Sequence, residues 1–348
     1  METRICPPTE ENLRLAGEIL RAGGLVGMPT ETVYGLAADA TNPKAALSVF
    51  AAKGRPADNP LIVHISDLSQ LPVVVRQVPE RAKKLLSAFW PGPLTMILEK
   101  APAIPAEVTA GLDTVAVRFP VHPVARALID AAGRPLAAPS ANLSGRPSTT
   151  TAEHVLHDLQ GRIPLILDGG PCQVGLESTV VDLSRGPAVL LRPGGVTREM
   201  LEAALGEPVA LGKGVMEPLP EGEKALSPGL KHRHYAPRAQ VVVVLGGDEA
   251  RGAYVRAHAR EDARPCALCL EKNRGLYGEV PVLSAGSTPE DYAHNLFAAL
   301  RAADEKGYTR VYAEGLDLAG VGLAVMNRVE RAAGFTVVRL DDAKEDRA

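Results

Sequence analysis

Two cations stand close together between a predicted helix and a predicted strand. Lys53 and Arg55 are two positions apart in KGRP, and Asn59 follows in the segment NPLIVHI. Paired cations of this kind suit a polyphosphate. The spacing G-x-x-x-x-G-K-[ST] of a Walker A loop is absent, so this is a different kind of anion site. From these residues alone, a solvated loop is the alternative interpretation.

Hydroxyl, amide and carboxylate side chains follow two further predicted strand ends. The segment PTETVYGL begins at Pro29, and the segment PSANLSG begins at Pro139. Ligands of open α/β folds bind beyond the ends of the strands. Small polar side chains at such a place let a phosphate or a ribose approach closely. A turn or a helix cap explains single residues of these segments equally well.

Arg118 stands in the apolar strand segment VAVRF. Burying a guanidinium costs free energy unless it meets an anion. That anion is either a protein carboxylate or a ligand carboxylate, and the sequence leaves both open. His64 in LIVHI poses a similar choice between a core histidine and a site residue. Ser178 and Arg192 add polar groups at later strand ends.

Several common catalytic arrangements are absent from the sequence. No Ser/His/Asp order, H-E-x-x-H motif or paired carboxylates stand out, so hydrolysis by those routes has little support. Four cysteines are too few for a disulfide framework. Cys266 and Cys269 form a lone C-x-x-C without a second pair at zinc spacing. We interpret these thiols as packing residues and expect no protein-built metal site.

The elements that must position these residues alternate between short apolar strands and helices. This alternation predicts an α/β domain, and the close spacing of the later strands favours a mixed sheet over a purely parallel one. The expected helices cover residues 9–22, 43–53, 79–88, 122–133 and 196–205. The expected strands cover residues 25–31, 61–65, 94–98, 114–119, 135–139, 163–170, 178–183 and 188–192.

A second domain follows a segment of linker composition. Periodicity stops over residues 211–239, which are rich in Gly, Pro and charge. Strands and helices then alternate regularly, as in a small parallel doubly wound domain, but no G-x-G-x-x-G follows the first of these strands. We predict a catalytic domain over residues 1–210, a linker or lid over 211–239, and a Rossmann-like domain over 240–348. We expect the linker to cover the ligand site of the first domain; an idle spacer is the alternative.

Composition and charge limit the class of protein. The chain has 348 residues, of which 46% are hydrophobic and 23% charged, with a formal net charge of −3. This charge gives no reason to expect strong non-specific binding to nucleic acid. The first residues contain acids and lack the apolar core of a secretory signal. No apolar run approaches the ~20 residues that a membrane span needs. We therefore expect a cytoplasmic enzyme.

Seven motifs, in one order, resemble the YrdC/Sua5 family. They are PTETVYGLAADA, KGRPADNPLIVHI, WPGPLTMIL, VAVRFPVHP, APSANLSGRPSTT, LDGGPCQVGLESTVVDL and LLRPGGVT. Together they cover residues 29–197 almost continuously, without a departure at a motif position. The segment SPGLKHRHYAP and the tail that follows are similar to the two-domain Sua5 subtype. The implied fold is a YrdC-like mixed twisted sheet with flanking helices, joined to a smaller Rossmann-like parallel α/β domain.

The resemblance implies an enzyme that condenses L-threonine, bicarbonate and ATP into threonylcarbamoyl-AMP and pyrophosphate. Mg²⁺ is implied with the triphosphate. The product would serve a tRNA threonylcarbamoyl transferase complex that forms t6A at position 37, so contact with tRNA would be indirect or weak. The positions implied to contact ATP are Lys53, Arg55, Asn59, Thr114, Ser140, Asn142, Ser148, Arg192 and Tyr235. Those implied to contact threonine are Thr32, His64, Arg118, Ala138 and Ser178, and the principal catalytic charges would be Lys53, Arg55 and Arg118.

Two other functions are weighed against this one. The first is a carbamoyltransferase of hydrogenase maturation, which shares a YrdC-like module. Those proteins add an acylphosphatase segment and zinc-binding cysteines, and this sequence contains neither. The second is an RNA-binding module, because YrdC-like folds have a concave surface proposed to hold double-stranded RNA. The net acidic charge and the threonine-pocket residues count against that function.

Overall fold

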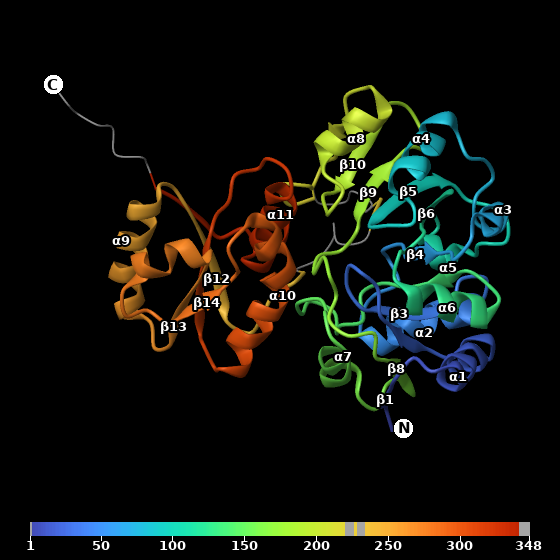
Figure 1. The fold of residues 1–348 in the computed structure, drawn as a ribbon, viewed down its shortest axis with the longest axis horizontal. Coiled ribbons are helices and arrows are strands. Elements are labelled where there is room, and N and C mark those ends of the chain that lie inside the picture. The colour runs from blue at the N-terminus through green and yellow to red at the C-terminus, as the bar shows by residue number, and fades with distance from the viewer. Residues whose placement is uncertain (1, 220–225, 228–233, 341–348) are drawn as a thin grey trace. The chain divides into compact units, whose positions relative to one another are not determined.

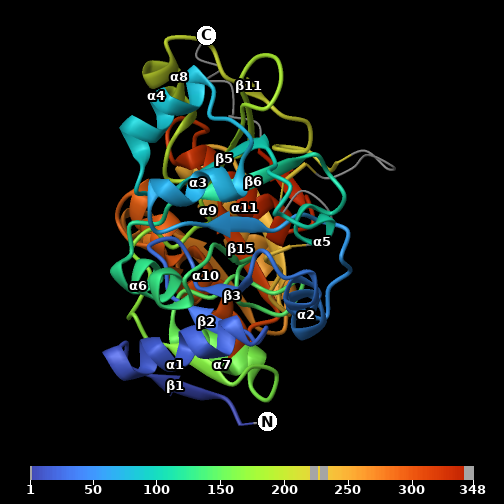
Figure 2. The same ribbon diagram turned by 90° about the vertical axis from the view of Figure 1, so that its right-hand side faces the viewer.

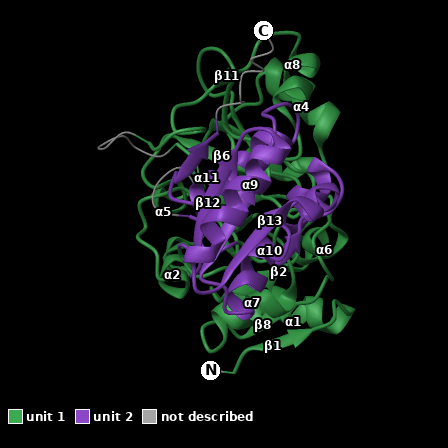
Figure 3. Cartoon of the chain, turned by 90° about the vertical axis from the view of Figure 1, so that its left-hand side faces the viewer, with its two compact units in different colours: residues 1–144, 148–232 green, residues 145–147, 233–348 purple. Residues whose placement is uncertain are grey.

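The computed structural model describes residues 2–219, 226–227 and 234–340 (Figure 1). The chain divides into two compact units (Figure 3). The first unit is Met1–Ser144 with Ser148–His232, and the second is Gly145–Pro147 with Arg233–Ala348. None of the described helices combines the length and the apolar character needed to cross a bilayer.

A mixed sheet of eleven strands forms the frame of the described first unit, in the order β1-β8-β2-β3-β7-β4-β6-β5-β9-β10-β11. The central pair β4/β6 is parallel, whereas β4/β7 and β5/β6 are antiparallel, which confirms the predicted mixed sheet. The strands are β1 Arg4–Cys6, β2 Val26–Met28, β3 Gly35–Asp39, β4 Ile62–His64, β5 Leu94–Glu99, β6 Thr114–Arg118, β7 Leu136–Ala137, β8 Leu165–Leu167, β9 Thr179–Asp182, β10 Val189–Arg192 and β11 Ala210–Leu211.

Local signals set the ends of the helices in this unit. The Thr9 side chain accepts a hydrogen bond from Asn12 N and begins α1. Asn42 caps α2 in the same way, and Gly54, with φ 61°, ends it in the left-handed conformation. The helices are α1 Glu10–Arg21, α2 Pro43–Lys53, α3 Leu71–Val74, α4 Glu80–Phe89, α5 Ala106–Thr109, α6 Pro123–Ala132, α7 Ala152–Leu159 and α8 Arg198–Leu205.

Helices α1 and α6 pack closely against each other and share a core with strands β2 and β8 (Figure 2). The helices approach so tightly at Gly17 that a Cβ there would lie 2.5 Å from Ala131 O. Leu20, Leu128 and Ile129 are fully buried in this core. Burying each such side chain contributes about 1.5–3 kcal/mol to the stability of the fold. This packing holds helices α1 and α6 against one half of the sheet. Helices α4 and α8 lie side by side at the other half (Figures 1 and 2).

The second unit is built on a parallel sheet of five strands in the order β14-β13-β15-β12-β16. This confirms the smaller parallel α/β architecture predicted for the C-terminal part. Helix α10 begins with a capping box formed by Thr288 and Asp291. The elements are β12 Gln240–Leu245, α9 Asp248–His258, β13 Pro265–Cys269, β14 Val282–Ser284, α10 Pro289–Glu305, β15 Arg310–Glu314, α11 Gly322–Ala332 and β16 Val337–Arg339, with short 3-10 helices at Ala259–Glu261 and Glu271–Tyr277. A further 3-10 helix, Leu68–Gln70, belongs to the first unit.

Candidate active site

A row of aligned positions crosses five neighbouring strands of the large sheet, from the central strand β4 to β10, which lies next to the edge strand β11. His64 on β4 lies opposite Arg118 on β6, and Arg118 lies opposite Thr95 on β5. Thr95 pairs with Val180 on β9, which in turn pairs with Arg192 on β10. Directly opposed residues lie on the same face of a sheet. The register therefore brings four polar side chains, far apart in the sequence, to one face.

An apolar row runs beside this polar row on the same face. Ile62, Ala116 and Ile97 stand two positions before or after His64, Arg118 and Thr95, and side chains two apart on a strand share a face. They pack with Val180 and Leu191 in one buried cluster. The polar side chains thus lie beside buried apolar side chains. Electrostatic interactions are stronger in such a region of low dielectric constant than in water.

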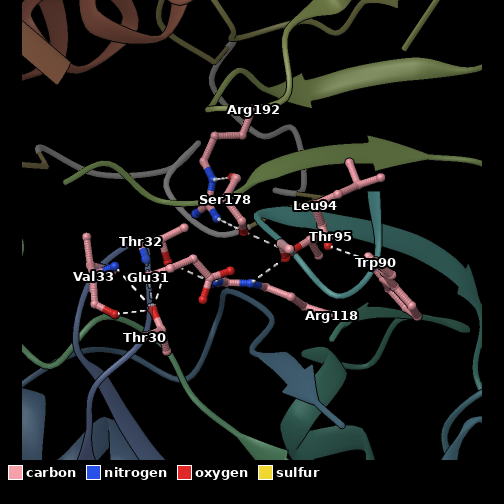
Figure 4. A network of polar contacts seen from close by, with 11 residues as sticks. Thr30, Glu31, Thr32, Val33, Trp90, Leu94, Thr95, Arg118, Ser178 and Arg192 are labelled. Carbon is pink, nitrogen blue, oxygen red and sulfur yellow. Dashed lines mark hydrogen bonds and ion pairs between the residues drawn. The ribbon is translucent and has the colours of Figure 1, made fainter. Parts of the chain in front are cut away.

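Arg118 is the centre of the polar row. Its side chain is only 4% exposed. Nη1 donates to Thr32 Oγ1 at 2.8 Å, Nε donates to Gly92 O at 3.4 Å, and Nη2 lies 2.7 Å from Glu31 Oε1 (Figure 4). Of the two anions that the sequence leaves open, the protein carboxylate is present. A second role for Arg118, in binding a ligand carboxylate, stays a prediction.

His64 is buried beside Arg118 and carries no charge near neutral pH. Burial, followed by the positive charge of Arg118, lowers the pKa of His64 to about 3. Its Nδ1 lies 3.1 Å from Ile62 O, and a carbonyl oxygen can only accept, so Nδ1 carries the proton and donates. Nε2 is consequently an acceptor. His64 can orient a hydroxyl or an ammonium, but it cannot neutralise an anion.

Ser178 ties the far end of the row to its centre. Arg192 Nε donates to Ser178 O at 3.0 Å, and Arg192 Nη2 donates to Ser178 Oγ at 3.1 Å. Ser178 Oγ also shares a hydrogen bond of 2.8 Å with Thr95 Oγ1 (Figure 4). The chain passes so close here that a Cβ at Gly194 would lie 2.5 Å from Thr179 N. Ser178 and Arg192 are therefore fixed as one unit.

The two cations of the Lys53–Arg55 segment are buried although Gly54 between them is exposed, so the interpretation of these cations as solvated is wrong. Lys53 is 3% and Arg55 9% exposed. Lys53 is the last residue of α2, and its Nζ donates to Ser140 O and, at 2.6 Å, to Asn142 O. In addition, Ser144 N donates to Lys53 O at 3.0 Å. One lysine thereby joins the KGRP segment to the PSANLSG segment.

Asn59 links the cation segment to the predicted linker. With its amide turned to satisfy both neighbours, Asn59 Oδ1 accepts from Arg55 Nη2 at 2.9 Å and Nδ2 donates to Ser227 O at 3.1 Å. Ser227 is fully buried. The described part of the linker that contains Ser227 therefore lies against the cation segment. Residues 228–233, which include the first three residues of the motif KHRHYAP, lie outside the described residues.

The remaining predicted ATP contacts are not all in one unit. Ser148 donates to Glu177 Oε1 and is fully buried. Thr114 begins β6, at the opposite end of that strand from Arg118. Tyr235 belongs to the second unit, where its ring centroid lies 5.2 Å from that of Phe297. The contact predicted between Tyr235 and the nucleotide thus stays a prediction.

Two predicted threonine contacts lie next to the polar row. Ala138 directly follows β7, and its N donates to Ile62 O at 2.9 Å, so it is held beside β4. Thr32 Oγ1 lies 2.9 Å from Thr30 Oγ1 and accepts from Arg118. The five predicted threonine contacts therefore come from segments that are joined directly, some by backbone hydrogen bonds and others by side-chain hydrogen bonds.

Glu31, Thr95 and Glu177 are site residues that the sequence-based set omits. Glu31 stands between two threonines of the segment PTET, which does mark it as part of a polar turn. Its partner Arg118, however, is 87 positions away in the chain, and no local pattern reveals such a pairing. Thr95 could be found only from the strand register.

No protein nucleophile or metal cage is evident among the described residues. They contain no group of three or more His, Cys, Asp and Glu that could hold a metal ion. Burial raises the pKa of the Cys172 thiol to about 12, so this nearby cysteine stays protonated. Cys266 and Cys269 are fully buried in β13, as packing residues are. The charged and hydrogen-bonding side chains described above are of the kind that can bind and orient charged molecules.

Comparisons with known proteins cover both units. Residues 18–194 match the Sua5, YciO and YrdC family model described as "Telomere recombination". Residues 196–334 match the model described as "Threonylcarbamoyl-AMP synthase, C-terminal domain". The chain is 46% identical to the threonylcarbamoyl-AMP synthase of Pyrococcus abyssi, over 95% of this chain and 96% of that protein. It is 48% identical to that of Bacillus subtilis, over 93% of each.

A solved structure is similar over nearly the whole chain. The crystal structure of P. abyssi Sua5 complexed with L-threonine has a TM-score of 0.90 and 44% identity, covering 97% of this chain and 99% of that one. Both domain models and nearly full-length relatives thus agree. The chain belongs to the YrdC/Sua5 family and has the two-domain form of its threonylcarbamoyl-AMP synthases.

Proposed function

We propose that the chain condenses L-threonine, bicarbonate and ATP into threonylcarbamoyl-AMP and pyrophosphate. The observation that carries this proposal is the buried polar row of His64, Arg118, Thr95 and Arg192, in a unit that also buries the cations Lys53 and Arg55, in a chain of this family. One group of side chains suits a small zwitterion, and the other suits a polyphosphate.

Threonine binds at Arg118 in this proposal. The planar guanidinium can hold a carboxylate with two parallel hydrogen bonds, and its contacts with Thr32 and Gly92 fix its plane in advance. His64 and Ser178 offer neutral hydrogen-bonding groups that can face the hydroxyl and the amine. Ala138 closes the pocket with its backbone and a small side chain.

ATP binds along the cation segment. Lys53, Arg55 and Arg192 supply positive charge to the phosphates, and Asn59, Ser140, Asn142 and Ser148 supply uncharged hydrogen bonds. Thr114 and Tyr235 complete the proposed set of contacts. Mg²⁺ prefers phosphate oxygens and water over protein cages, so its proposed ligands belong to the triphosphate and it adds neutralising charge there.

The proposed reaction needs alignment rather than a protein nucleophile. Threonine arrives as an ammonium and must first give up one proton, R–NH₃⁺ → R–NH₂ + H⁺. The neutral amine and bicarbonate then form a carbamate, R–NH₂ + HCO₃⁻ → R–NH–COO⁻ + H₂O. A carbamate oxygen then forms a bond to the α-phosphorus, and the bond from this phosphorus to the bridging oxygen breaks as pyrophosphate leaves. Holding both reactants in line removes much of the entropic barrier. Lys53, Arg55 and Arg192 stabilise the charge that grows on the leaving group.

The proposal extends to the surroundings of the reaction. The product is an activated acyl-adenylate that water destroys, so a transferase that modifies tRNA at position 37 should consume it directly. Contact of this chain with tRNA is proposed to be indirect or weak, as expected from its net charge of −3. Since ATP and tRNA are available in the cytoplasm, we propose that the protein works there.

Direct detection of the product tests the proposal. The protein is incubated with ATP, Mg²⁺, threonine and ¹³C-bicarbonate, and the nucleotides are separated and weighed by mass spectrometry. A threonine- and ¹³C-containing adenylate is expected. Salt-dependent binding of double-stranded RNA without this product would instead favour the RNA-binding module.

A further inference from the structure

Glu31 is a buried carboxylate that the proposed mechanism does not yet use. It stands in the turn after β2, and its side chain is 2% exposed. The backbone holds it firmly, because Val174 N donates to Glu31 O at 2.8 Å. The residues on either side, Thr30 and Thr32, hydrogen-bond to each other at 2.9 Å. Glu31 therefore has a fixed position at the end of the Arg118 guanidinium (Figure 4).

The hydrogen bonds of Glu31 are missing. Among the described residues, neither of its two carboxylate oxygens accepts a hydrogen bond. Arg118 Nη2 lies 2.7 Å from Oε1, yet the two groups are not aligned as donor and acceptor, and Nη2 makes no hydrogen bond either. Buried polar groups in folded proteins nearly always have partners. Two acceptors without donors, beside a donor without an acceptor, therefore point to a ligand that supplies both.

An α-amino acid zwitterion supplies what this pair lacks. Its ammonium brings three N–H donors, and its carboxylate brings acceptors for a guanidinium. The other groups that face Glu31 cannot replace the ammonium. The Cys172 thiol is protonated and donates only weakly. Burial lowers the pKa of His122, which favours its uncharged ring; Nδ1 of that ring accepts from Val124 N at 3.2 Å, and its one remaining N–H makes no hydrogen bond to Glu31.

We propose that Glu31 is the ammonium-binding half of the amino-acid site, with Arg118 as the carboxylate-binding half. This inference rests on the proposed function, in which threonine is a substrate. It adds Glu31 to the proposed threonine contacts and gives a reason why the site would prefer an amino acid. Insertion of threonine replaces one poorly aligned ion pair by two aligned ones. A small hydroxy acid without an amine would pair with Arg118 but leave the buried Glu31 carboxylate without a hydrogen-bond donor. The site therefore selects amino acids over hydroxy acids that lack the amine.

The experiment compares two ligands and three forms of the full-length protein by calorimetry. The ligands are L-threonine and 3-hydroxybutanoate, which is threonine without the amine. The proteins are the wild type, Glu31→Gln, and Glu11→Gln as a matched control on the exposed surface of α1. Melting temperatures show whether each variant is folded. A lost hydrogen bond between charged groups corresponds to roughly 10- to 150-fold in affinity.

The wild type and Glu11→Gln are expected to bind threonine at least tenfold more tightly than 3-hydroxybutanoate, by the same estimate. Glu31→Gln is expected to lose most of this preference, because threonine binds more weakly while 3-hydroxybutanoate binds equally well or better. An equal loss for both ligands would overturn the proposal and make Glu31 a structural residue, as would unchanged threonine binding.

A comparison within the wild type keeps the proposal testable if Glu31→Gln does not fold. Wild-type protein that binds threonine and 3-hydroxybutanoate equally would overturn the role of Glu31 while leaving the proposed function intact. Wild-type protein that binds no threonine would instead count against the proposed function itself.

Discussion

At the scale of single residues, the candidate site depends on charged side chains that are buried inside the first unit. Arg118, Glu31 and Lys53 are each less than 5% exposed. Burial of unmatched charge costs several kcal/mol per ion, so such groups persist only where they have partners or a function. Arg118 and Glu31 have an incomplete set of hydrogen bonds, which marks them as binding groups. Lys53 holds two chain segments together, which gives it a structural task as well as a proposed catalytic one.

Replacing Arg118 by Lys should affect threonine far more than ATP. Lys keeps the charge but loses the fork that holds a carboxylate with two hydrogen bonds. A lost charge-assisted contact of about 1.5–3 kcal/mol corresponds to roughly 10- to 150-fold in the KM of threonine. Steady-state kinetics with each substrate varied in turn measures this difference.

Arg134→Lys is the matched control, because Arg134 Nη1 pairs with Asp39 Oδ2 at 2.6 Å outside the site. It should leave both KM values unchanged. If Arg118→Lys keeps the threonine KM and only lowers the melting temperature, Arg118 is a structural ion-pair residue.

Lys53→Met should lower both turnover and stability, since the lysine is not a surface charge. Ser140 O and Asn142 O lose their shared donor, and unsatisfied buried carbonyls cost about 1–3 kcal/mol. Urea unfolding gives the stability, and pyrophosphate release gives the turnover. Lys44→Met, at an exposed position of the same helix, should change neither. Unaltered stability of Lys53→Met would contradict the connecting role of Lys53.

From the lowered pKa of the buried His64 ring we predict that the protein loses stability as the pH falls below neutral. An unfolded histidine takes up a proton below about pH 6.5, whereas the buried ring of His64 resists protonation down to a pKa of about 3. The unfolded state then binds more protons than the folded state, so the free energy of unfolding falls as the pH falls. From pH 7 to pH 5, the wild type should lose about 2 kcal/mol more than His64→Gln does. Parallel slopes in urea titrations at both pH values would contradict a buried neutral His64.

At the scale of elements, the sequence predicts where helices and apolar strands lie but not how strands pair. Helix α2 has the predicted limits because Asn42, Pro43 and Gly54 mark its ends. Strand β3, by contrast, has no strand signal: its sequence GLAAD is poor in β-branched residues, and only pairing with β2 and β7 makes it a strand.

The candidate site was only partly predictable for the same reason. Motif residues such as Lys53 and Arg118 can be singled out because charge in an apolar setting is unusual. The row that joins His64, Arg118 and Thr95 depends on long-range register, to which local spacing gives no access. The bond between Lys53 and Ser140 O likewise joins segments 87 positions apart.

The linker is the element whose predicted role is most open to experiment. Ser227 contacts Asn59 within the first unit, and Tyr235 packs in the second. We predict that the linker closes over the bound substrates, so ATP and threonine together should slow proteolysis within residues 211–239. Tyr235→Ala should lower turnover. Tyr235→Phe should keep the ring packing, so any change in its turnover measures the contribution of the hydroxyl alone. Cleavage that ignores the ligands, with full activity of both variants, would make the segment a tether.

At the scale of the whole molecule, the two units differ in how many of the proposed substrate contacts they contain. All the proposed threonine contacts and all the proposed ATP contacts except Tyr235 belong to the first unit. The second unit has a complete parallel sheet with its own core, in which Val242, Tyr277 and Tyr312 are buried. The chemistry proposed here therefore follows from the first unit, and the linker is the predicted connection between the two.

The central claim is that adenylate transfer waits for a carbamate made from threonine. The most direct measurement is the rate of pyrophosphate release from ATP by the full-length protein, with threonine and bicarbonate omitted in turn. Because no protein nucleophile is evident among the described residues, we predict release only when both are present, with bicarbonate removed by degassing and carbonic anhydrase-coupled depletion. Equal release of pyrophosphate without threonine would contradict the account.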